Sequence, residues 1–275
     1  MTQGSIRLGD RGVVGVSGVD APEFLQGLLT NDVLALANGR ARYAALLSPQ
    51  GKILFDFLAV RMAGGFYLDC AADQAQALAK RLGFYRLRAK VVIEDLSATH
   101  GIASGLPLPL PPGGYADPRH ADLGWRMIAL LADLPEAGDM APYEARRIAL
   151  GVPKGGVDFA FGDTFPHEAN LDRLHGVDFK KGCYVGQEVV SRVEHRGLAR
   201  KRIVRLLYDG ESPALGAAVT AGDVALGVMG SSAAGHGLAM LRLDRLAEAA
   251  GVSVVAGGVD VRVIEEWQEK LGVQK

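Results

Sequence analysis

Cysteine is scarce in this chain of 275 residues, which carries only Cys70 and Cys183. Two cysteines form at most one disulfide, and one chain of this kind cannot supply four thiolates to a metal cluster. Metal-binding spacings such as CxxC and HExxH are also missing. The sequence therefore predicts no stably bound metal.

Long apolar runs, targeting signals and phosphate-binding loops are missing too. No apolar run approaches the roughly 20 residues that span a bilayer, and no signal peptide precedes the first strand-like stretch. These absences predict a cytoplasmic protein with no membrane partner. The GxxxxGK(S/T) pattern does not occur, which argues against nucleotide hydrolysis. A net charge of -1 with 22% charged residues is typical of a globular protein and does not predict nucleic-acid binding.

The N-terminal part of the chain is predicted to form short strands and helices. Residues 21–29 predict a helix, with Asp20 as the first residue of a capping box. Residues 41–47 and 52–61 are apolar runs on either side of Ser-Pro-Gln-Gly, a turn sequence that predicts a β-hairpin. Asp56 lies inside the second run, where it either faces solvent or has a function.

The rest of the chain mixes helices and strands and then turns to strands alone. Residues 80–90 hold five basic side chains and no acidic one, which fits either a solvated helix face or a site for an anion. From Lys201 onward, short apolar runs with glycine between them predict a small barrel or sandwich. The other predicted elements are strands at 66–70 and 90–95, helices at 73–88 and 141–150, and a proline-rich connector at 107–114.

The motif KGCYVGQE at 181–188 concentrates the reactive side chains of the chain. Lys181 and the lysine before it place positive charge near Cys183, and a helix predicted to begin close by adds the positive end of its dipole. Both effects favour thiolate over thiol. The hypothesis is a reactive, partly exposed thiol, and the alternative is a small buried hydrophobe. Gln187 and Glu188 add an amide and a carboxylate.

Several blocks of the chain resemble one known family. KGCYVGQE follows TFPHEANLD at 164–172 and GVDFK at 176–180, and it precedes a basic segment with HRG. Together these are similar to the signature of the YgfZ-type folate-binding proteins, relatives of the glycine-cleavage T-protein, the aminomethyltransferase. FLQGLLTNDV at 24–33, LLSPQGKILFDF at 46–57 and RIALGVP at 147–153 resemble the family's other blocks in the same order.

The resemblance implies an α+β fold, with a T-protein-like folate-binding core of mixed sheets and helices and a small C-terminal β-barrel. The core is expected from residues 1–100 and 140–197, and the barrel from 198–275. Residues 100–140 are poorly covered by the resemblance and are expected to form a trimmed second unit. The short strands predicted after Lys201 agree with the barrel.

The resemblance also implies a function. It indicates a folate-binding accessory protein that acts in iron-sulfur cluster assembly or repair on client enzymes, tRNA-modifying enzymes among them. Cys183 is then the functional thiol, with Lys181, Gln187 and Glu188 beside it. Tetrahydrofolate or a derivative is the implied cofactor, and iron-sulfur client or carrier proteins are the implied partners. The predicted folate contacts are Arg11, Asp56, Tyr143 and Tyr184.

One departure separates the chain from the transferase. The T-protein has a glutamate that grips the pterin within its Arg-Leu-Glu-Ala-Gly block, and this chain has Ala149 there. A methyl group cannot replace the hydrogen bonds of a carboxylate. A non-enzymatic assembly factor is therefore favoured over a tetrahydrofolate-dependent aminomethyl or one-carbon transferase with Asp56 near the reacting nitrogen. A third alternative, an RNA-binding interaction module, depends on the excess of basic residues at 180–205, which also fits a solvated face.

Overall fold

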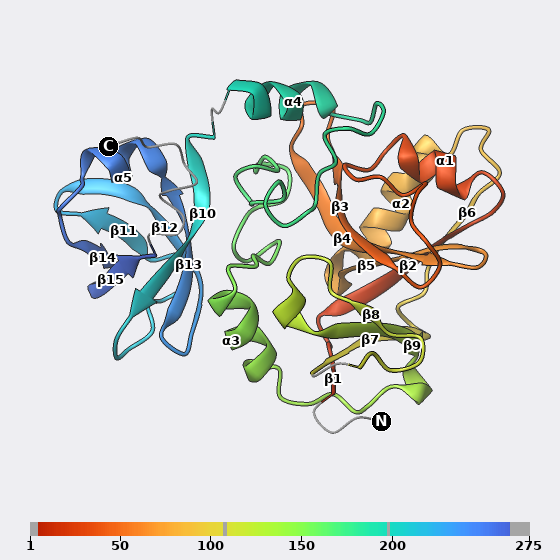
Figure 1. Cartoon of the computed structure of the whole chain (residues 1–275), viewed down its shortest axis with the longest axis horizontal. Helices are drawn as coiled ribbons and strands as arrows, with labels where there is room; N and C mark the ends of the chain where they lie inside the picture. Colours follow the sequence, from red (N-terminus) through yellow and green to blue (C-terminus); the bar gives the residue numbers. More distant parts are fainter. Residues whose placement is uncertain (1–4, 107–108, 197–198, 265–275) are drawn as a thin grey trace. The chain divides into compact units, whose positions relative to one another are not determined.

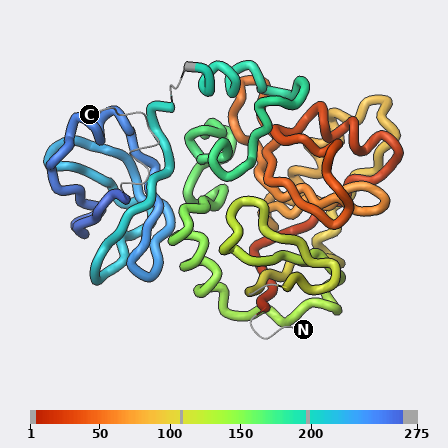
Figure 2. Tube along the Cα trace, viewed as in Figure 1, coloured from red at the N-terminus to blue at the C-terminus, as the bar shows by residue number. Residues whose placement is uncertain are grey.

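The computed structural model describes residues 5–106, 109–196 and 199–264 (Figure 1). Figure 2 follows the same chain as a tube from the N-terminus to the C-terminus. Among the helices within these ranges, none is both long enough and apolar enough to cross a membrane.

Contacts divide the chain into two compact units. Unit 1 joins Met1–Met140 to Leu171–Ser191, and unit 2 joins Ala141–Asn170 to Arg192–Lys275. Each unit therefore contains two segments that are far apart in the sequence.

Unit 1 contains a five-stranded antiparallel sheet in the order β3-β4-β5-β2-β6. β3 and β4 form the predicted hairpin, with Ala45 opposite Asp56. Side chains alternate between the two faces of such a sheet. Asp56 therefore points to the face opposite that of its neighbours Phe55 and Phe57, which lie in the apolar cluster. The strands are β2 (Arg11–Ser17), β3 (Ala41–Leu47), β4 (Ile53–Met62), β5 (Gly65–Ala71) and β6 (Val92–Asp95).

Two helices, α1 (Ala21–Gln26) and α2 (Ala75–Tyr85), pack on one face of this sheet. Leu25 and Leu78 of the helices share one buried cluster with sheet residues that include Phe57. Full burial of each such side chain contributes roughly 1.5 to 3 kcal/mol. This cluster is the apolar core of unit 1.

The predicted capping box at the start of α1 is wrong. The Asp20 side chain makes no cap hydrogen bond to the helix, and its Oδ2 instead accepts the backbone N–H of Lys90 at 2.7 Å. The carboxylate satisfies a loop amide from the segment before β6, which is a long-range contact that the local pattern does not contain.

Residues 100–140 contribute most of a second, four-stranded sheet of unit 1, in the order β1-β7-β9-β8. Trp125 and Leu134 pack in its small apolar cluster. The sheet brings Arg126 and the loop at Asp117 into unit 1, and both residues are buried. The strands are β1 (Ile6–Arg7), β7 (His100–Gly105), β8 (Tyr115–Ala116) and β9 (Trp125–Leu130).

Unit 2 contains the predicted barrel, which is closed in the order β10-β13-β12-β11-β14-β15. Val204, Leu206 and Leu241 are among the buried side chains that fill it. The elements are β10 (Lys201–Tyr208), β11 (Ala218–Ala221), β12 (Val224–Ala233), β13 (His236–Arg242), α5 (Leu243–Glu248), β14 (Val254–Ala256) and β15 (Val259–Val263).

Helix α3 (Ala141–Ala149) belongs to unit 2, together with the barrel. The reason is Arg147, which is 3% exposed. Its guanidinium donates to Glu144 on the same helix, to Asp158 at 2.9 Å and to Ser231 of β12 at 2.7 Å. A buried charge with several acceptors holds this position strongly, so the helix follows the barrel.

Candidate functional site

The two cysteines of the chain have opposite environments. Cys70 on β5 is buried, and burial raises the pKa of its thiol to about 12, so it is an inert core residue. Cys183 is exposed. The alternative of a buried hydrophobe therefore describes Cys70, and Cys183 is the accessible thiol.

Cys183 lies on a loop of residues 178–186, called the thiol loop here, which precedes α4 (Gln187–Arg196). The loop begins with a local turn, because the Asp178 carboxylate accepts the backbone N–H groups of Lys180 and Lys181 at 2.7 and 3.1 Å. Asp side chains commonly close such turns. The cysteine thus follows an ordered turn, and the predicted helix begins after it.

The ammonium of Lys181 is bound by backbone carbonyl groups. Its Nζ donates to the backbone carbonyls of Gln26, Leu29 and Asn31 at 2.8, 2.6 and 2.9 Å. An ammonium has three N–H donors, and all three are used. Burial lowers the pKa of this ammonium to about 8, so it remains mostly charged at neutral pH. Lys181 anchors the thiol loop to the turn after α1.

The other end of the thiol loop is fixed by glycine. Gly186 has a φ of +82°, and a Cβ there would lie 2.5 Å from the Ser48 carbonyl oxygen and 3.1 Å from the Gly51 Cα. Only glycine accepts both this backbone angle and this contact. The loop therefore packs directly on the turn of the β3–β4 hairpin.

The segment before the thiol loop is joined to β3 through Thr30 and Asn31. Thr30 Oγ1 donates to the Gly176 carbonyl at 2.6 Å and accepts the Ala45 N–H at 2.9 Å. Asn31 Nδ2 donates to the carbonyls of Tyr43 and His175 at 2.8 and 2.6 Å. Both side chains are buried, where hydrogen bonds of this kind are costly to leave unmade.

The remaining predicted residues of the motif have different surroundings. Tyr184 is 7% exposed, its ring lies 5.3 Å from the Lys181 Nζ, and burial, with a smaller effect of Asp178, raises the pKa of its hydroxyl to about 12. It belongs to the base of the loop. Gln187 and Glu188 stand in the first turn of α4, half-buried and exposed respectively.

A second candidate site lies on the sheet face opposite α1 and α2. Arg11, Tyr43, Asp56 and Asp69 stand at alternate positions from the apolar residues of their strands. Register places Arg11 of β2 opposite Ala71 of β5, so Arg11 and Asp69 are diagonal neighbours on one face of the sheet. This face is buried as well, and Asp56 is only 6% exposed. The solvent alternative for Asp56 is therefore wrong.

Asp69 joins two arginines in this face. Its Oδ1 accepts Arg11 Nε at 2.7 Å, and its Oδ2 accepts Arg126 Nε at 2.8 Å. Arg11 also donates to the Asp69 backbone carbonyl at 2.6 Å. With Asp69 at 0% and Arg126 at 1% exposure, these charges stabilise the fold only as a group.

Arg119 and Asp117 extend the network. The Arg119 guanidinium is bidentate to the Asp117 carboxylate, at 2.9 and 2.7 Å, and its Cζ lies 5.8 Å from the centre of the Tyr43 ring. Burial raises the pKa of Asp117, but the charge and hydrogen bonds of Arg119 outweigh it and hold that pKa below 3.8. Asp117 is therefore a carboxylate at neutral pH.

Burial in this network favours the neutral form of the Asp56 carboxyl group. Tyr43 donates its hydroxyl to Asp56 Oδ2 at 2.9 Å, and burial raises the pKa of Asp56 above 3.8, partly offset by Arg11. A carboxyl group with a raised pKa in a site with several arginines is a candidate for contact with a polar ligand.

Tyr43 and Asn31 connect the two candidate sites within unit 1. The Lys181 Nζ donates to the Asn31 carbonyl, and the Asn31 Nδ2 donates to the Tyr43 carbonyl. The Tyr43 hydroxyl in turn donates to the Asp56 carboxylate. A Cβ at Gly176 would lie 2.8 Å from the Tyr43 ring, so this ring also fixes the segment that leads to the thiol loop. The arrangement unites Arg11 and Asp56 of the predicted folate contacts in one network.

Tyr143, the remaining predicted folate contact, lies in unit 2, on α3, and is 8% exposed. Its contact with folate stays a prediction. The sequence analysis missed Tyr43, Asp69, Asp117, Arg119 and Arg126. Asp69 could have been identified in the same way as Asp56, because each is an acidic residue inside an apolar strand.

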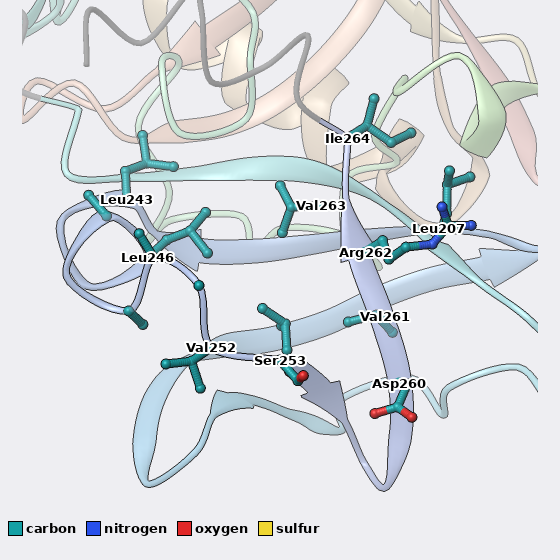
Figure 3. A pocket seen from close by; sticks show the side chains of 15 residues that line it. Leu207, Leu243, Leu246, Val252, Ser253, Asp260, Val261, Arg262, Val263 and Ile264 are labelled. Carbon is teal, nitrogen blue, oxygen red and sulfur yellow. The ribbon is translucent and has the colours of Figure 1, made fainter. Parts of the chain in front are cut away.

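A pocket of about 930 Å³ lies in unit 2, within the barrel domain. Figure 3 shows Leu243 and Leu246 of α5 and Val261 and Val263 of β15 around it. Its lining is largely aliphatic, and none of the predicted site residues belongs to it.

The fold and the site define a class of protein. Residues 9–103 match the family model of the GCVT N-terminal domain, and residues 200–270 match that of the CAF17 C-terminal beta-barrel domain. A solved structure of the glycine cleavage system aminomethyltransferase T from Bartonella henselae superposes with a TM-score of 0.75 at 21% identity, covering 94% of this chain and 84% of that one. The chain has the aminomethyltransferase-like fold with a closed six-stranded barrel.

Relatives identify the family within this class. The chain is 34% identical to the mouse iron-sulfur cluster assembly factor IBA57, mitochondrial, over 87% of this chain and 78% of the relative. The human protein of that name is 32% identical with the same coverage. The homolog from Mycosarcoma maydis is 35% identical over 72% of this chain, which spans 55% of that longer protein. The chain belongs to the family of IBA57-type assembly factors, whose bacterial counterpart is YgfZ.

The expectation of a cytoplasmic location is contradicted by this comparison. The relatives from mouse, Mycosarcoma maydis and Neurospora crassa are all named as mitochondrial proteins. Mitochondrial targeting segments are amphipathic and basic, so a search for long apolar runs does not distinguish these compartments.

Proposed function

We propose that the protein acts in iron-sulfur cluster assembly or repair on client enzymes, through the thiol of Cys183. The observation that carries the proposal is the exposed cysteine on a loop whose two ends are fixed, by Lys181 and by Gly186. Membership of the family of assembly factors supports it. tRNA-modifying enzymes are among the clients in this proposal.

The chemistry follows from the thiol. Thiolate is the ligand that iron-sulfur clusters prefer, and a fixed loop presents it to a partner without a large loss of conformational entropy. One exposed thiol cannot hold a cluster alone, so the other ligands come from a client or carrier protein. In this proposal the chain is an assembly factor, and the iron-sulfur cluster is cargo.

Cys183→Ala is expected to abolish the function while the fold is retained. In cells that lack the protein, the wild type restores the activity of a 4Fe-4S enzyme and the variant does not, because an alanine methyl offers no ligand to iron. Cys70→Ala is the matched control at the other, buried cysteine, and it is expected to rescue to the extent that it folds. Equal rescue by wild type and Cys183→Ala contradicts the proposal.

We also propose that tetrahydrofolate or a derivative binds to the buried network around Asp56. The support is a set of arginines and carboxylates of the kind that reads the polar edge of a pterin and holds a carboxylate tail. The family model of the GCVT N-terminal domain covers the strands that carry Arg11, Asp56 and Asp69. Catalytic turnover of an aminomethyl donor with tetrahydrofolate would favour the transferase instead.

Asp56→Asn is expected to weaken folate binding at least tenfold, since the loss of a charged hydrogen-bond partner costs about 1.5 to 3 kcal/mol, while the protein becomes no less stable. The folded pKa of Asp56 is raised, so its stabilising contribution is complete below about pH 4 and is lost as the pH rises through the folded pKa. The melting temperature of the variant relative to wild type should therefore increase from about pH 4 to pH 7. Calorimetric titration with 5-formyl-tetrahydrofolate and thermal melts measure both. Unchanged affinity counts against folate contact by Asp56.

A further inference from the structure

Unit 1 exposes large apolar side chains at the end of α2, at the start of β6 and on the segment between them. The backbone of this segment runs at the upper right of Figure 1. Phe84 is 64%, Leu87 is 89% and Val92 is 51% exposed. Val19, which is 76% exposed, is joined to the same segment, because its neighbour Asp20 accepts the Lys90 N–H. Single exposed apolar residues are ordinary, but a group of them marks an interaction site.

Leu87 is held outward by an unfavourable backbone. Its φ is +42°, in the left-handed region that residues with a Cβ rarely adopt. The turn around it is closed by the hydrogen bond from the Ala89 N–H to the Arg86 carbonyl at 2.7 Å. With the Leu87 side chain 89% exposed among the described residues, packing does not offset the strain of this turn.

Five basic residues lie in the same stretch of sequence, residues 80–90, as Phe84 and Leu87. Within the described part of the chain, these cations have neither a side-chain hydrogen bond nor an ion pair. The dipole of α2 favours Arg86, its C-cap residue, but not the two cations in the middle of the helix or the two beyond its end. The cations are Lys80, Arg81, Arg86, Arg88 and Lys90.

The neighbouring strand edge carries the opposite charge. β6 is the outermost strand of its sheet, and its residues Glu94 and Asp95 are exposed. A lipid surface or an RNA backbone is uniformly anionic and would be repelled by these carboxylates. A folded protein can match a surface on which positive and negative groups stand side by side.

We propose that this α2–β6 surface, Phe84, Leu87 and Val92 with the basic residues of 80–90, docks an iron-sulfur protein that presents an apolar pocket with carboxylates opposite the cations and a basic side chain opposite Glu94 and Asp95. The proposal rests on the proposed function for the identity of the partner. Exposed aromatic and arginine side chains are the residues that dominate binding energy at such contacts. In this proposal the α2–β6 surface binds the partner protein, and the Cys183 thiol contacts the iron-sulfur cluster that the partner carries.

Site-specific photo-crosslinking tests the surface directly. Cells that lack the native factor receive the full chain with p-benzoyl-phenylalanine in place of Leu87, or of Leu215 in the barrel as a control that is 63% exposed. We expect an iron-sulfur protein to crosslink at position 87 and not at 215. The yield should fall about tenfold with Arg86→Glu and Arg88→Glu, because like charges then face the partner.

Rescue assays separate this proposal from the proposed function. Phe84→Ser with Leu87→Ser should reduce rescue of a 4Fe-4S enzyme although Cys183 is intact, and Leu215→Ser should not. The surface proposal is overturned, and the proposed function stands, under three results together. Cys183→Ala does not rescue, the double variant rescues fully, and no iron-sulfur protein crosslinks at position 87. If Cys183→Ala rescues fully, the crosslink at 87 still decides the surface. Sedimentation with anionic vesicles, a tRNA shift or weaker folate binding caused by the charge reversals would each overturn it.

Discussion

Asp69→Asn is expected to destabilise unit 1 more than any other single exchange of one polar side chain for another of its size. Asp69 is the shared partner of Arg11 and Arg126, and an asparagine amide offers one neutral acceptor where the carboxylate offers two charged ones. Breaking a buried ion pair from one side costs about 3 to 5 kcal/mol, because a buried charge is left uncompensated. Urea denaturation of the full chain measures the loss.

A matched control and a double variant give this prediction its specificity. Asp73→Asn, at an exposed position after the same strand, should change the free energy of unfolding by less than about 0.5 kcal/mol. Arg126→Met added to Asp69→Asn should cost less than the two changes measured singly, because it removes one of the unpaired cations. A loss below about 1 kcal/mol for Asp69→Asn would mean that water already compensates the arginines.

The hairpin and the barrel were predictable from local sequence. Ser-Pro-Gln-Gly between two apolar runs specifies a tight turn, and β3 and β4 pair around it as expected. Short strands separated by glycine specify many turns, and the closed barrel follows. These features depend on residues close in the sequence, and local patterns contain that information.

The buried network was not predictable in the same way. Asp69 and Arg126 are 57 positions apart, and alternation along one strand does not reveal whether its polar face is covered. Asp56 was assigned on that basis either to solvent or to a function, and its burial in the structure excludes solvent. Tertiary burial outweighs the strand pattern here.

The thiol loop shows the same limit at Lys181. Sequence places this lysine two positions from Cys183, which suggested an electrostatic effect on the thiol. The structure gives its three donors to carbonyls about 150 positions earlier in the chain. That the KGCYVGQE motif is the functional centre of the chain stays a prediction, and the contacts of its lysine depend on the fold, which spacing cannot show.

Lys181→Met is therefore expected to lose function although Cys183 is untouched. Methionine keeps most of the aliphatic length but leaves the carbonyls of Gln26, Leu29 and Asn31 without their donor. Hydrogen bonds to a charged group contribute about 1.5 to 3 kcal/mol each, less the desolvation of the ammonium. A net loss of about 2 to 4 kcal/mol should appear in urea denaturation.

Lys180→Met is the matched control, because the Lys180 side chain is exposed and makes no hydrogen bond or ion pair with the described residues. We expect it to retain stability and rescue. Alkylation of Cys183 in the folded protein separates the two lysines further: a released loop in Lys181→Met should change the rate at least several-fold, and Lys180→Met should leave it within about twofold, since one exposed charge in water acts weakly. If Lys180→Met abolishes rescue and Lys181→Met retains it, the positive charge beside the thiol matters more than the anchored loop.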